Sequence, residues 1–123
     1  MTKTAADLIG TAAAHQNIAA GGNVVSASRD VSGKIGIMLT AHVAYGAGIP
    51  GTDPFIEIIT SSDDANYDTE AYDAFYVPRL ASNTKQISFP LRFAEDVKYY
   101  KVKITNGATN AIDVWILAVE VAL

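Results

Sequence analysis

The sequence has no cysteine and only two histidines among its 123 residues. The lack of cysteine excludes disulfides, thiolate zinc sites, iron–sulfur clusters and cysteine nucleophiles. Two histidines supply at most two imidazole ligands to a metal. Basic residues are also scarce, because nine Lys and Arg stand against thirteen Asp and Glu, giving a net charge of −4. We therefore expect neither nucleic acid nor an anionic membrane surface as a partner.

Long apolar runs and known catalytic motifs are missing as well. No window reaches the roughly 18 apolar residues of a transmembrane helix, and Asp7 and Gly10 interrupt the N-terminal stretch before it resembles a signal peptide. We expect a chain made and folded in a cytoplasm. His15 and His42 have no motif partner in the sequence, and no nucleophile elbow or zinc-protease motif occurs. The sequence predicts a protein that is not an enzyme.

One glycine-rich segment has the letters of a dinucleotide-binding fingerprint. Residues 46–51 read G-x-G-x-x-G and follow a predicted strand. That fingerprint binds pyrophosphate only where a helix begins, whereas Asp53-Pro54 and a β-branched run follow here. We interpret the segment as a loop and expect no cofactor.

What the sequence does contain is β-structure in a single domain. Half of its residues are apolar, and from residue 17 onward they recur with a period of two between turn signals. The expected strands are 23–25, 35–45, 55–60, 72–77, 87–93, 99–105 and 112–121. Seven or so short strands with spaced turns predict an all-β fold, a single-domain antiparallel β-sandwich of jelly-roll type.

Residues 1–16 differ from this β-domain, which we expect to span 17–123. Thr4 followed by Asp7 is a weak helix-capping signal before an Ala-rich stretch that reaches His15. Leu8 and Ile9 are the only large apolar residues of the segment. It is predicted either as a short helix or as an N-terminal arm.

The last strand, 112–121, carries apolar residues on both faces. Trp115, Leu117, Val119 and Val121 alternate with Ile112, Val114 and Ile116. An outer face of a sandwich is normally polar, so something covers the second face: either the N-terminal segment or another subunit. The predicted subunit-interface residues are Leu8, Ile9, Trp115, Leu117, Val119 and Val121.

An acidic stretch lies between residues 63 and 73. Asp64, Asn66, Asp68 and Glu70 have the alternate spacing of oxygen ligands that calcium loops use. Thr69 and Phe75 stand where an EF-hand loop needs Gly and Glu. The stretch is either a solvated connection with turn-forming residues or a calcium site formed by those four side chains.

Aromatic side chains suggest another ligand class. Tyr and Trp combine an apolar ring with a polar tip, which suits stacking against sugars. The candidates are Tyr67, Tyr72, Phe75, Tyr76, Tyr99 and Trp115. They form either a platform for carbohydrate or ordinary strand packing.

Three segments together resemble a known kind of protein. They are the opening 27–32, the strand and polar turn 54–67, and the hairpin strand 99–106 before the apolar C-terminal strand. This layout resembles small jelly-roll virion proteins of tailed bacteriophages, of the head-decoration or neck and tail-accessory kind. The resemblance covers most of residues 20–123 and implies a non-enzymatic component present in many symmetric copies.

The expected function is therefore a structural protein of a bacteriophage virion. Such a chain would form a homo-oligomer, bind neighbouring capsid or tail subunits, and be assembled into the virion in the host cytoplasm. The alternative, from a different class, is a carbohydrate-binding β-sandwich module.

Overall fold

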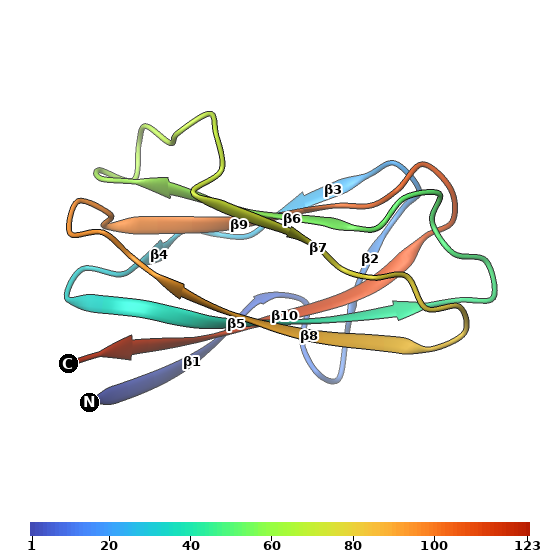
Figure 1. The fold of residues 1–123 in the computed structure, drawn as a ribbon, viewed down its shortest axis with the longest axis horizontal. Coiled ribbons are helices and arrows are strands. Elements are labelled where there is room, and N and C mark those ends of the chain that lie inside the picture. The colour runs from blue at the N-terminus through green and yellow to red at the C-terminus, as the bar shows by residue number, and fades with distance from the viewer.

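The computed structural model describes residues 1–123 and contains strands but no helix. Two antiparallel sheets lie one above the other, as the two layers of Figure 1 show. The strands in chain order are β1 (Thr2–Ile9), β2 (Gln16–Ile18), β3 (Asn23–Val25), β4 (Arg29–Asp30), β5 (Lys34–Tyr45), β6 (Phe55–Ser61), β7 (Asp73–Tyr76), β8 (Thr84–Arg92), β9 (Tyr99–Thr105) and β10 (Ile112–Ala122). No helix in the chain is long and apolar enough to cross a membrane.

The strand order is that of a jelly roll. Sheet A has the order β1-β10-β5-β8, with β2 also paired to β10, and sheet B has the order β3-β9-β6-β7, with β4 also paired to β9. If β1 with β2 and β3 with β4 are each taken as one interrupted strand, every sheet has four strands. The expected all-β sandwich of jelly-roll type is thus confirmed.

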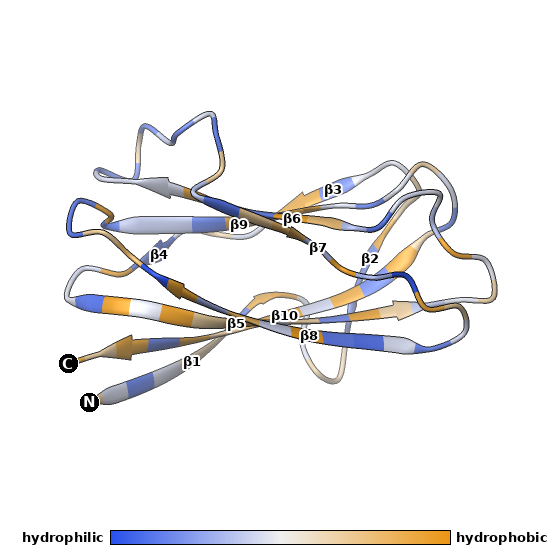
Figure 2. Cartoon of the chain, viewed as in Figure 1, coloured by the Kyte–Doolittle hydropathy of each residue, from blue (hydrophilic) through white to orange (hydrophobic).

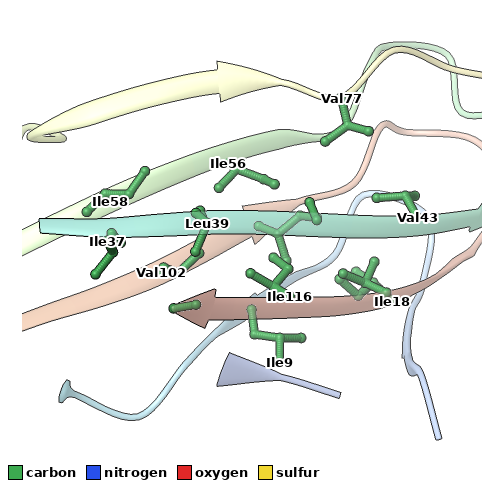
Figure 3. Close-up of a cluster of buried hydrophobic side chains, with 14 of the residues drawn as sticks. Ile9, Ile18, Ile37, Leu39, Val43, Ile56, Ile58, Val77, Val102 and Ile116 are labelled. Atoms are coloured by element: carbon green, nitrogen blue, oxygen red, sulfur yellow. The ribbon is translucent and has the colours of Figure 1, made fainter. Parts of the chain in front are cut away.

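The core lies between the sheets and follows from the period-two pattern of the long strands. In β10 the side chains of Ile112, Val114 and Ile116 are at most 1% exposed, and those of the alternate residues point away from the core. Figure 2 shows that apolar and polar residues share most strands. Figure 3 shows isoleucine, leucine and valine side chains of both sheets meeting in this core.

The N-terminal segment is a strand, so the expected short helix is wrong. β1 pairs antiparallel with β10, from Thr2 opposite Ala122 to Ile9 opposite Ile116, with a bulge between Asp7 and Ile9. The helix preference of alanine amounts to a fraction of a kcal/mol per residue. Backbone pairing with the free edge of β10 and burial of Ile9, which is 3% exposed, outweigh it.

Candidate interaction surface

The outer face of sheet A, meaning its side turned away from the core, has an apolar centre. Cα partners in register place side chains of neighbouring strands side by side on this face. The apolar members are Ala5 of β1, Trp115, Leu117, Val119 and Val121 of β10, Met38 of β5 and Pro90 of β8. Four of the six predicted interface residues therefore share one surface.

Strand β1 lies beside β10 in the same sheet and does not cover that surface. Ile9 is directed into the core at 3% exposure, and Leu8 is half-buried at the bulge next to it. Residues 1–16 contact the second apolar face of β10 at its Trp115 end, where the His15 ring lies 6.3 Å from the Trp115 ring between centroids and Asp7 accepts a hydrogen bond from Trp115. Met38, at the centre of the face, is 41% exposed.

Trp115 is held in a fixed orientation on this face. Its indole stacks on the imidazole of His42, with ring centroids 4.2 Å apart and an interplanar angle of 14°. Its Nε1 donates a hydrogen bond of 2.7 Å to Asp7 Oδ1. These contacts restrain the side chain before any partner arrives, which lowers the entropy lost on binding.

A shallow hollow of about 330 Å³ lies at one end of the same face. Gly36 forms its floor, and Met38, Pro90, Arg92 and Val121 line it. A Cβ atom at Gly36 would collide with the carbonyl oxygen of Leu91 on β8. The glycine therefore permits close pairing of β5 with β8 and leaves space above the sheet.

The acidic loop between β6 and β7 is ordered by its own side chains. Asp63 Oδ1 accepts hydrogen bonds from the backbone amides of Ala65 (2.9 Å) and Asn66 (2.8 Å), and these bonds hold the pKa of Asp63 well below its usual range. Ser61 Oγ accepts from the backbone amides of Asp63 and Asp64. This is the behaviour of turn-forming Asp and Ser residues.

The four calcium candidates have separate positions in that loop. Asp64 accepts a hydrogen bond from the hydroxyl of Tyr67, Asn66 Nδ2 donates to Asp63 Oδ2 at 2.9 Å, and Asp68 accepts from Thr60 Oγ1 at 3.4 Å. Glu70 is exposed. No group of three or more His, Cys, Asp or Glu side chains converges as a metal site would require. Calcium binding stays a prediction.

The aromatic candidates are likewise dispersed. Phe75 points inward and stacks on Phe89, with the two ring centroids 3.6 Å apart. The Tyr72 hydroxyl donates to the backbone oxygen of Arg92 at 3.1 Å. Tyr67 lies under Lys101 Nζ, 4.1 Å from its ring centroid, and burial together with the contact to Asp64 raises its pKa to about 12. Tyr76, 59% exposed beside Phe55 on the outer face of sheet B, is the most accessible ring among them.

A buried carboxylate that was not identified from the sequence joins the two sheets. Glu120 of β10 is 1% exposed. It accepts hydrogen bonds from Arg29 Nε (3.0 Å) and Nη2 (2.8 Å), Lys34 Nζ (2.6 Å) and Tyr100 Oη (2.9 Å). Burial alone would raise its pKa, but the hydrogen bonds from Arg29, Lys34 and Tyr100 lower it by more, so that the pKa is about 2. Glu120 lines none of the surface hollows.

The strand pattern contained a signal for this group. Glu120 falls in the same alternation as Ile112, Val114 and Ile116, so the period of two places a charge on the core face. A buried charge requires partners. Burial and charge of the same cluster also raise the pKa of Tyr100 well above its usual value, so its hydroxyl remains a donor.

Comparison with solved structures shows the same fold in proteins of very different sequence. The VP2 protein of infectious bursal disease virus, solved as a subviral particle, matches with a TM-score of 0.67 and 11% identity. That match covers 98% of this chain but 32% of VP2, so the chain spans about a third of the viral protein. The T13 particle of the same virus gives a TM-score of 0.62 at 11% identity, over 98% of this chain and 31% of that one.

A carbohydrate-binding protein has the same architecture. The C-terminal CBM6 of LamC, a marine laminarinase from Zobellia galactanivorans, matches with a TM-score of 0.54 and 10% identity, over 96% of this chain and 90% of that one. No family model matches the sequence, and no curated protein does either. At these identities the comparisons establish the jelly-roll fold.

Proposed function

We propose that this chain is a non-enzymatic structural protein of a virion, present in many copies and binding neighbouring subunits. The observation that carries the proposal is the apolar outer face of sheet A, which strand β1 flanks without covering. Contiguous apolar surface of this kind marks protein–protein contact sites. The jelly-roll fold shared with VP2 supports the proposal.

The finer assignment is to a tailed bacteriophage, as a head-decoration or a neck and tail-accessory protein. It rests on the resemblance of residues 27–32, 54–67 and 99–106 to such proteins. The partners would be further copies of the chain and other capsid or tail proteins. Assembly would take place in the host cytoplasm.

The test is to look for the chain in purified particles. Particles made by the organism that encodes the chain are banded on a density gradient, treated with protease-free nuclease, and analysed by quantitative mass spectrometry. We expect the chain to band with the major capsid protein at a fixed copy ratio. A non-structural protein of the same genome is the control, and absence of the chain from the band overturns the proposal.

A carbohydrate-binding module is the second candidate, and Tyr76 is the observation that favours it. This ring is 59% exposed and has Phe55 at 4.6 Å between ring centroids. An exposed aromatic ring on a jelly-roll sheet is able to stack on a sugar. A glycan array probed with the chain and with Tyr76→Ala tests this role: binding that the substitution abolishes supports it, and a screen without any bound glycan rejects it.

A further inference from the structure

We propose that the outer face of sheet A binds a second copy of this chain, face to face, about a two-fold axis that crosses the strands. The inference rests on the proposed function, because it names the neighbouring subunit and its orientation. It is argued from the size of the face, from the order of side chains along it, and from the charges at its ends.

The position of the axis sets the size of the interface. With the axis at Val119, residues 116–122 of β10 lie opposite their counterparts, which is roughly 23 Å at about 3.3 Å per residue. The four strands that lie side by side, β1, β10, β5 and β8, cover roughly 19 Å at about 4.8 Å per strand. The resulting area of roughly 440 Å² is about half of the ~800 Å² that each partner of a stable complex contributes, so we expect a dimer that dissociates on dilution.

Three successive rows of side chains cross the face, each with one residue from β1, β10, β5 and β8. The first row is basic at both ends, the middle row is apolar throughout, and the third carries one acid at the β1 edge. In that order of strands, the rows are Lys3, Val121, Gly36 and Arg92; then Ala5, Val119, Met38 and Pro90; then Asp7, Leu117, Thr40 and Ser88.

The charges select one of the two possible orientations. A two-fold axis that crosses the strands at the middle row brings Lys3 opposite Asp7 of a second copy, twice in each dimer, while Val119 and Met38 face their own counterparts. An axis parallel to the strands would bring Lys3 opposite Arg92, which is repulsive. Complementary charge fixes register in this way, and two sheets pack with their strands within about 30° of each other.

The hollow above Gly36 receives a side chain of the second copy in the same dimer. The two-fold axis places the first row opposite the third, so Leu117 of the second copy lies opposite Val121 at the rim of the hollow. Its volume of about 330 Å³ is enough to accept a leucine side chain. The surface is thus self-complementary in charge and shape, as a two-fold interface requires.

The first experiment reverses the charges. Lys3→Glu places two acids opposite each other, and combining it with Asp7→Lys restores the pairs in the opposite sense. By sedimentation equilibrium we expect Lys3→Glu to weaken dimerisation about tenfold or more and the double variant to recover most of the loss. Equal dimerisation of the wild type and Lys3→Glu overturns the proposed orientation.

The second experiment does not depend on Asp7, which also binds Trp115. Because the chain has no cysteine, Val119→Cys gives a single thiol at the centre of the face. A short bis-maleimide should convert this variant into a covalent dimer. Ala74→Cys, exposed in β7 of the other sheet, is the matched control. Failure of Val119→Cys to cross-link, or equal cross-linking of both variants, rejects the dimer.

The two proposals fail in different ways. A chain that bands with particles but shows neither cross-linking nor charge dependence has a different protein against this face, which overturns the dimer and leaves the virion function standing. A dimer that is absent from particles supports the interface and contradicts the virion function.

Discussion

At the scale of single residues, Glu120 is the least expected group in the fold. A carboxylate transferred from water to a core costs several kcal/mol unless it is paired and hydrogen-bonded. Here two cations and a phenol satisfy it, with Arg29 and Tyr100 from sheet B and Lys34 from the same sheet as Glu120. The carboxylate of Glu120 therefore links β10 to β9 and to the segment that contains β4 and the start of β5.

We predict that Glu120→Gln loses about 3 kcal/mol of stability at neutral pH. The carboxyl has a pKa of about 2 in the folded chain against an ordinary value of 4.5. Between these values the unfolded chain takes up the proton first, so acid removes the stabilisation. The wild type should thus lose stability as the pH falls from 4.5 towards 2, and Glu120→Gln should show a flatter profile in urea unfolding.

Glu57→Gln is the matched control, because Glu57 is half-buried in sheet B and forms no ion pair. It should stay within about 0.5 kcal/mol of the wild type. A Glu120→Gln profile that runs parallel to the wild type from pH 4.5 to 2 would contradict the assignment of the buried charge.

Gly36 gives a second prediction at this scale. Gly36→Ala should destabilise the chain by about 1–3 kcal/mol, because its Cβ would collide with the backbone oxygen of Leu91. Gly46→Ala is the control, since nothing lies within 4 Å of a Cβ there. Thermal unfolding measures both, and equal stability of the two variants would show that β5 and β8 separate freely at Gly36.

At the scale of elements, strand β1 is the element whose observed structure differs most from the one that the sequence predicts. Its composition favoured a helix or an arm, and its pairing with β10 is decided by a strand more than 100 residues later in the chain. Local propensity holds no information on such a partner. Only Ile9, at the end of the strand, enters the core.

We predict that Ile9→Ala costs about 2–4 kcal/mol, because its side chain is 3% exposed between the sheets. Thr2→Ala, exposed at the other end of β1, should change stability by less than about 0.5 kcal/mol. Urea unfolding checks both. An Ile9→Ala variant as stable as the wild type would mean that this segment does not dock on β10 in solution.

Four of the longer strands were predictable because a period of two leaves a clear trace. The ranges 35–45, 55–60, 99–105 and 112–121 each agree with an observed strand within one residue at either end, whereas the range 87–93 begins three residues after the start of β8. The short strands β2 and β4 were not predicted, since three and two residues are too few to show a period. Alternation also separated the two faces of β10, but it did not reveal that Arg29 and Lys34 meet Glu120.

At the scale of the whole molecule, the fold accounts for the exposed face. Both sheets close on one core, which leaves each with an outer side, and sheet A carries valine, leucine, methionine and tryptophan on its outer side where polar residues are usual. This outer side is the surface to which we assign the proposed contact with a second copy of the chain.

The solution mass of the purified chain, measured by light scattering over a range of concentrations, tests this account most directly. We predict a mass that rises with concentration to twice the 13.0 kDa of one chain, and a Val119→Lys variant that keeps the fold but stays at the mass of a single chain, since a charge at the centre of the face opposes its burial. A mass of 13.0 kDa at every concentration, with no difference between the wild type and Val119→Lys, would contradict the claim that sheet A binds a second copy.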